Sequence, residues 1–163
     1  MNATKQKTRN LGLAKRRALR IIRRSQPKNV QEARAAGLRL WEIGVNCGAF
    51  RQTYRIWGTG LVIKFPREEW GDAITHTRDE VKKIRALNEF KVMRRYLPPV
   101  YYYNGRDGVM VTDYYSKVSP PKNLRPMFTE LLFAYTGVEV GDLFGDNIRC
   151  KRNGEPVIVD LGY

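Results

Sequence analysis

The positive charge of this chain is concentrated near its N-terminus, and this divides the sequence at about residue 40. Residues 1–40 hold 12 lysines and arginines against one acidic residue, Glu32, whereas the remaining 123 residues hold 18 basic and 15 acidic ones. The second part is nearly balanced, while the first carries +11 and must keep that charge in water or against an anionic partner. The charge distribution therefore predicts a basic N-terminal arm over residues 1–40, followed by a folded domain.

The arm mixes apolar and basic residues in a helical pattern. Residues 5–24 are compatible with a basic amphipathic helix, Pro27 interrupts it, and a second helix is expected from about Asn29 to Leu40. Three interpretations of the charge are open. The helix packs on the domain with its charges outward, or it contacts the phosphates of a nucleic acid, or it contacts an acidic protein. Composition does not separate them.

Composition excludes several classes of protein. Two cysteines and one histidine, His76, are too few for a disulfide scaffold or for a metal motif with two histidines. No apolar run is long enough for a membrane helix, and the first ten residues lack the apolar segment of a signal peptide. We therefore expect a soluble cytoplasmic protein that does not contact a membrane.

From residue 41 onward, short apolar or alternating runs are separated by glycine, which indicates an antiparallel sheet. The expected order is three strands, one long helix and two strands, over residues 41–45, 50–57, 61–65, 74–96, 100–103 and 109–112. A proline-containing stretch and a short helix at 126–135 follow. Asn153-Gly154 then predicts a hairpin between residues 147–151 and 156–160.

Two motifs near the C-terminus carry candidate chemistry. Gly141-Asp142-Leu143 is followed by Asn147, with four residues between Asp142 and Asn147. Asp160, within Val159-Asp160-Leu161-Gly162, lies thirteen residues after Asn147. In this order the motifs resemble the catalytic loop and the magnesium-binding motif of the protein-kinase-like superfamily. They are closest to aminoglycoside phosphotransferases and other small-molecule kinases. The resemblance implies that Asp142 orients or deprotonates the attacking hydroxyl, and that Asn147 and Asp160 hold Mg²⁺.

The first part of the domain matches the same superfamily more weakly. Lys64, within Val62–Phe65, is similar to the third-strand lysine that contacts the α and β phosphates of ATP, and Glu80 on the following helix is its expected anionic partner. Gly44 and Gly48 resemble a glycine-rich loop over the phosphates. The alternative for Lys64 is an exposed residue on an alternating strand.

The fifth expected strand runs into a segment that resembles the hinge of this superfamily. Thr112 would lie at the back of the nucleotide pocket, while Asp113 and Tyr115 would hydrogen-bond adenine through their main chains. The alternative for the glycine-rich loop is an ordinary hairpin that contains two glycines. The alternative for the hinge is a strand that ends in a polar loop.

The resemblance implies an α+β, protein-kinase-like fold. A five-stranded antiparallel N-lobe sheet with one main helix would occupy residues 41–115, and a strongly reduced C-lobe residues 116–163. The expected activity is ATP- and Mg²⁺-dependent phosphoryl transfer to a protein or small-molecule hydroxyl. A catalytically inactive nucleotide-binding or interaction module, whose basic arm binds nucleic acid or an acidic protein, is the alternative. Val140 replaces the histidine that usually precedes the catalytic loop in this superfamily. A homodimer would cover the apolar surface that the reduced C-lobe leaves exposed.

Overall fold

The computed structural model describes residues 3–43, 50–115, 129–130, 132–134, 137 and 147–161, and for residues 3–10 the backbone alone. The described part is α+β, with a five-stranded antiparallel sheet of order β1-β2-β3-β5-β4. The chain divides into two compact units. The first comprises Met1–Thr77 and Val100–Tyr114, and the second Arg78–Pro99 and Tyr115–Tyr163. Within the described ranges, no helix has the length and apolarity that crossing a membrane requires.

The first unit begins with two helices, α1 (Ala3–Ser25) and α2 (Val30–Ala35). The Asn29 side chain caps α2 by accepting a hydrogen bond from the Glu32 backbone N–H at 2.9 Å. The prediction that this helix reaches Leu40 is wrong. Gly37 adopts φ +93°, and the Leu38 N–H donates to the Ala33 carbonyl, so the helix closes in a glycine C-cap after fewer than two turns.

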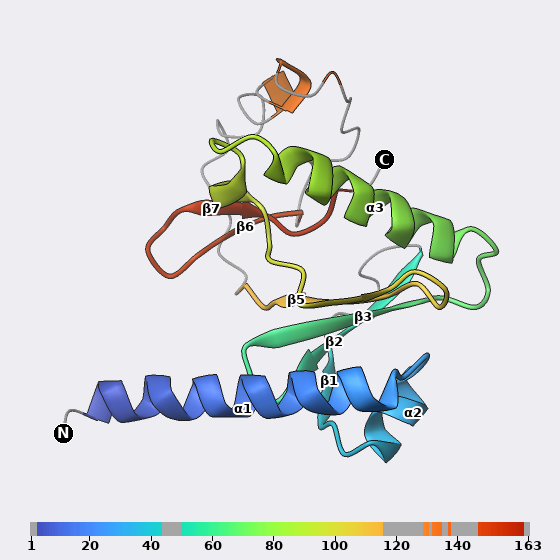
Figure 1. Cartoon of the computed structure of the whole chain (residues 1–163), viewed down its shortest axis with the longest axis vertical. Coiled ribbons are helices and arrows are strands. Elements are labelled where there is room, and N and C mark those ends of the chain that lie inside the picture. Colours follow the sequence, from blue (N-terminus) through green and yellow to red (C-terminus); the bar gives the residue numbers. More distant parts are fainter. Residues whose placement is uncertain are drawn as a thin grey trace. The chain divides into compact units, whose positions relative to one another are not determined.

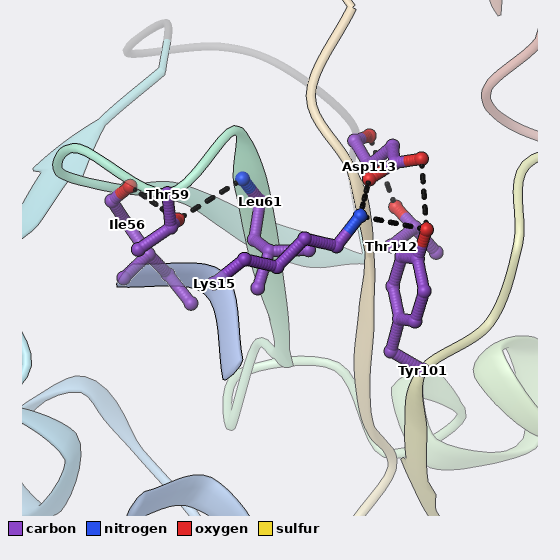
Figure 2. Close-up of polar contacts among 7 residues, drawn as sticks. All are labelled: Lys15, Ile56, Thr59, Leu61, Tyr101, Thr112 and Asp113. Carbon is purple, nitrogen blue, oxygen red and sulfur yellow. Dashed lines mark hydrogen bonds and ion pairs between the residues drawn. The ribbon is translucent and has the colours of Figure 1, made fainter. Parts of the chain in front are cut away.

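The five predicted strands of the sheet are present, with small differences at their ends. They are β1 (Leu40–Glu42), β2 (Arg51–Ile56), β3 (Leu61–Pro66), β4 (Tyr102–Asn104) and β5 (Val109–Asp113). The predicted turn between β2 and β3 is confirmed, with positive φ at Gly58 and Gly60. Between them, the Thr59 hydroxyl donates to the Ile56 carbonyl at 2.7 Å and accepts from the Leu61 N–H at 3.1 Å (Figure 2).

One face of the sheet packs against α1, which runs along it in Figure 1. Because side chains alternate between the faces of a strand, Ile63 on β3 and Val111 on β5 point to the same side. They join Ala18, Leu19 and Ile22 of α1 in one buried cluster. The helix of the basic arm is therefore part of the first unit, with its apolar stripe in the core.

Helix α3 (Ala73–Asn88) is the expected long helix, but the prediction that it reaches Tyr96 is wrong. At its end the backbone changes to three-residue spacing, since the Glu89 N–H donates to Ala86 and the Phe90 N–H to Leu87. The Arg94 Nε also donates to the Asn88 carbonyl at 2.5 Å. Turns and a short 3₁₀ helix, η1 (Arg94–Tyr96), follow. The spacing of three between Leu87 and Phe90 fits this tighter winding as well as an α-helix.

The second unit contains the predicted C-terminal hairpin. Strands β6 (Ile148–Cys150) and β7 (Pro156–Ile158) pair antiparallel around a turn in which Gly154 has φ +84°. Strand β7 contacts η1, and the Lys83 ammonium of α3 donates to the Leu161 carbonyl at 3.3 Å. Residues 129–130 and 132–134 are helical, in the region of the predicted short helix, whose other residues lie outside the described part.

Candidate functional site

Lys64 is buried on a strand whose first five residues are all buried. Only 6% of the residue is exposed, and its register partners are Thr53 on β2 and Met110 on β5. It lies on the face of the sheet opposite α1, because Ile63 and Phe65 take the α1 side. An exposed residue on an alternating strand, the alternative for Lys64, is therefore ruled out. A buried lysine is rare unless it is paired, and Lys64 does not lack a partner.

Thr112 shares this face of the sheet with Lys64. Val62 pairs with Thr112 and Lys64 with Met110, so Lys64 and Thr112 are diagonal neighbours across β3 and β5. Thr112 is 3% exposed. The sheet therefore brings together, on one side, two of the residues predicted to bind nucleotide.

The end of β5 leads into the segment that resembles a hinge. Asp113 pairs with Leu61, and the next N–H, that of Tyr114, donates to the Gly60 carbonyl at 2.8 Å. The Tyr114 N–H is thereby used within the sheet. Tyr114 is flanked by Asp113 and Tyr115, the two residues predicted to bind adenine through their main chains. Tyr115 also has an interaction partner within the chain.

The Asp113 side chain has a role that the sequence did not reveal. The Lys15 ammonium of α1 donates to Asp113 Oδ1 at 2.6 Å and to the Tyr101 hydroxyl at 2.7 Å, and the Tyr101 hydroxyl donates to Asp113 Oδ2 at 3.0 Å (Figure 2). The ammonium also lies 3.9 Å from the centre of the Tyr101 ring. We call Lys15, Tyr101 and Asp113 the Lys15 cluster. It ties the basic helix to the strand that ends at the predicted hinge.

The Lys15 cluster shifts the titration of two of its members. Burial lowers the pKa of Lys15, but the hydrogen bonds and charges of Asp113 and Tyr101 outweigh burial and raise it above 10.5. Burial is also the main reason that the pKa of Tyr101 is raised above 10.0. Both folded-state pKa values exceed the unfolded ones. Their contribution to stability is therefore complete below about pH 10 and is lost as the pH rises through the folded values.

Replacing Lys15 by methionine is expected to lower the free energy of unfolding at pH 8 by roughly 1.5–3 kcal/mol, the range for hydrogen bonds to charged groups. As the pH rises above about 10.5, the wild type should lose stability faster than Lys15→Met, so the difference between them shrinks. Urea unfolding from pH 8 to 11.5 measures both effects, with the exposed Lys28→Met as the control. A difference that stays constant over this range would contradict the assignment.

Glu80 lies on the buried side of α3 and is 3% exposed. Val81, Ile84 and Leu87 of the same helix are also buried, as their spacing predicts. A carboxylate at such a position requires compensation, and Glu80 does not lack an interaction partner. Its predicted pairing with Lys64 stays a prediction.

In the second unit, Asn147 and Asp160 lie at the same end of the β6–β7 hairpin. The Val159 N–H donates to the Asn147 carbonyl at 2.7 Å, which places Asp160 one residue beyond the strand partner of Asn147. Leu161, which follows Asp160, is 1% exposed. A carboxylate and an amide oxygen are hard ligands that suit Mg²⁺, so the donor set fits this ion. Within the described ranges, no cluster of three His, Cys, Asp or Glu side chains could hold a metal.

Three predicted site residues, Gly44, Gly48 and Asp142, lie outside the described residues. The residue at which the description resumes, Phe50, is well anchored within the first unit. Its ring stacks on His76 with centroids 3.7 Å apart, meets the edge of Trp70 at 5.3 Å, and its carbonyl accepts from the Arg67 N–H. The beginning of β2 is thus fixed by an aromatic cluster.

Comparison with known proteins adds no relative to these observations. Neither the family models nor the curated proteins that were searched contain a match to this chain.

Proposed function

We propose that the chain is an ATP- and Mg²⁺-dependent phosphotransferase that acts on a hydroxyl group of a protein or small molecule. The observation that carries the proposal is the burial of Lys64, on the same face of the sheet as Thr112. A protein keeps a lysine in such a place when the cation has a specific anion to hold. A polyphosphate is the anion that the motifs around Asp142 and Asp160 imply.

The proposed roles follow from the chemistry of each side chain. Lys64 binds the α and β phosphates, and Asn147 and Asp160 hold Mg²⁺, which supplies charge neutralisation on the triphosphate when bound. Asp142 orients the acceptor hydroxyl and takes its proton. The hydroxyl oxygen then forms a bond to the γ phosphorus while the bond from that phosphorus to the β–γ bridging oxygen breaks, and ADP leaves. This reaction depends on positioning and charge neutralisation rather than on a covalent enzyme intermediate.

Binding of MgATP tests the role of Lys64. At a nucleotide concentration of 100 Kd, a ligand that binds only the folded state adds about 2.7 kcal/mol, which is a rise of about 5–10 °C in the Tm of a chain of this length. The wild type should show such a rise with ATP and Mg²⁺ together, and Lys64→Met should lose most of it. The control is Lys82→Met, because Lys82 is an exposed lysine of α3 and should keep the full shift.

The comparison of the two lysine variants separates the outcomes. Their Tm values without nucleotide show whether each variant folds. An equal MgATP shift in wild type and Lys64→Met would exclude Lys64 from the nucleotide site, and no shift in the wild type would refute nucleotide binding. The cytoplasmic location and a homodimer stay predictions.

A further inference from the structure

Helix α1 presents an exposed surface that is rich in arginine. Between residues 16 and 24, every residue that is exposed is an arginine. At about 100° per residue, the five fall within an arc of about 120° on the side of the helix opposite Ala18 and Ile22. We call this surface the basic face; its members are Arg16, Arg17, Arg20, Arg23 and Arg24.

No carboxylate in the described part of the chain neutralises the basic face. Among the described residues, no carboxylate forms an ion pair with any of the five, and the one hydrogen bond from them is Arg23 to the Tyr101 carbonyl, at 3.3 Å. The one acidic residue of the first forty, Glu32, accepts a hydrogen bond from the Lys28 N–H within the cap of α2. Arginines four residues apart repel one another along the helix. The fold therefore tolerates a concentrated positive charge that an anionic partner would relieve.

The first unit also holds the basic face in place. Ala18, Leu19 and Ile22 are buried in the core, and Lys15 is bonded to Asp113 and Tyr101. Lys15, directly before this stretch, thus points toward the sheet, while the arginines point outward. A partner therefore meets a helix that is already ordered, and binding does not have to fold it.

We propose that the basic face docks on double-stranded DNA and contacts its phosphates. Guanidinium groups form paired hydrogen bonds with phosphate oxygens. Arg17 and Arg23 border opposite sides of the arc, so a helix entering the major groove, about 12 Å wide, presents an arginine toward each phosphate wall. Residues 11–24 contain no asparagine or glutamine to read adenine.

An acidic protein fits this surface less well. Stable protein–protein interfaces have an apolar or aromatic core surrounded by a polar rim. Between positions 16 and 24 no exposed residue is apolar or aromatic. Leu13, which lies four residues before Arg17 on the same side of the helix, is 52% exposed, but one leucine is too little for such a core. The surface therefore offers contacts to regularly spaced anions and little else, which is the chemistry of a nucleic-acid backbone.

Fluorescence anisotropy of the full chain with a labelled 20-base-pair duplex, from 50 to 200 mM NaCl, tests the proposal. The logarithm of the association constant should fall linearly with the logarithm of salt, with a slope of about −0.9 per neutralised phosphate. For three to five contacts this predicts a loss of roughly 40- to 500-fold over that range. Replacing Arg16, Arg20 and Arg23 by glutamine should weaken binding at least tenfold at 50 mM and reduce the slope by about 2.7.

The matched control removes the same charge elsewhere in the first unit. Arg34→Gln, Arg39→Gln and Arg106→Gln alter three exposed arginines that lie outside α1. This triple variant should bind within about threefold of the wild type, since its charges act only through the screened field. Equal losses in the two triple variants would show that net charge alone binds DNA and would overturn the proposal.

Two further arms address the partner and the fold. The same assay compares duplex DNA with single-stranded DNA, duplex RNA and polyglutamate. If any of these three bound more tightly than duplex DNA, the assignment to duplex DNA would be overturned. Phenylglyoxal modifies exposed arginines, and peptide mass spectrometry locates the modified residues. In the wild type, DNA should protect the arginines between positions 16 and 24, and this measurement does not depend on a variant that folds. Reactivity unchanged by DNA would also overturn the proposal.

Discussion

Replacing Asp160 by alanine is expected to lower phosphoryl transfer from labelled ATP by at least roughly 10³-fold, because a bound Mg²⁺ contributes several kcal/mol of charge stabilisation to such a transfer. Asp160 follows β7 at the end of the hairpin where Asn147 also lies. Without its carboxylate, the remaining amide oxygen of Asn147 would hold the ion weakly. The measurement is label incorporation into the chain itself or into an added acceptor, with ATP and Mg²⁺ present.

Asp142→Ala, assayed in the same way, should also lose transfer but should keep the MgATP-dependent rise in Tm, because Asp142 is assigned to the hydroxyl and not to the metal. The control is Asp79→Ala, which removes a half-exposed carboxylate of α3 and should transfer label at the wild-type rate. Transfer that neither Asp160→Ala nor Asp142→Ala changes would show that catalysis does not use this site. Nucleotide binding with no transfer in the wild type would instead favour the inactive nucleotide-binding module.

Replacing Ile22 by alanine is expected to lower the free energy of unfolding by about 2–5 kcal/mol. Ile22 is fully buried between α1 and the sheet, so the substitution removes apolar contact and leaves a cavity. Urea unfolding at pH 7 gives the difference. The control is Leu13→Ala on the same helix, at an exposed position, which should change stability by no more than about 0.5 kcal/mol.

The comparison of Ile22 with Leu13 also decides how the basic arm behaves in solution. If the two substitutions had equal small effects, α1 would be a solvated arm and the packing described for it would be refuted. A large effect of Ile22→Ala alone would establish α1 as part of the first unit.

Most of the sheet was predictable because its signals are local. Alternating apolar residues and the glycines at 58 and 60 define β2, the turn and β3 without reference to the rest of the chain. The ends of the helices were less predictable. Gly37 ends α2 although Leu38 and Leu40 continue an apolar pattern, and the turns after Asn88 replace the last two turns expected of α3. Termination depends on backbone geometry that hydrophobic spacing does not encode.

The residue types of the candidate site could be predicted from the sequence, but the burial and the contacts of these residues could not. The position of Lys64 within an apolar run pointed to a functional lysine, but the same pattern fits an exposed residue, and the burial of the lysine became evident from the structure. In the Lys15 cluster, Lys15 is 86 positions from Tyr101 and 98 positions from Asp113 in the sequence. No spacing rule connects positions so distant, and no sequence pattern favours Lys15 over its basic neighbours.

A crystal structure of the chain with Mg²⁺ and a non-hydrolysable ATP analogue would show whether Lys64, Asn147 and Asp160 surround one nucleotide. We expect a metal ion about 2.0–2.1 Å from oxygen atoms of Asp160 and Asn147, with the Lys64 ammonium within hydrogen-bonding distance of the α or β phosphate. A nucleotide bound elsewhere, with Lys64 and Asp160 both remote from its phosphates, would contradict it.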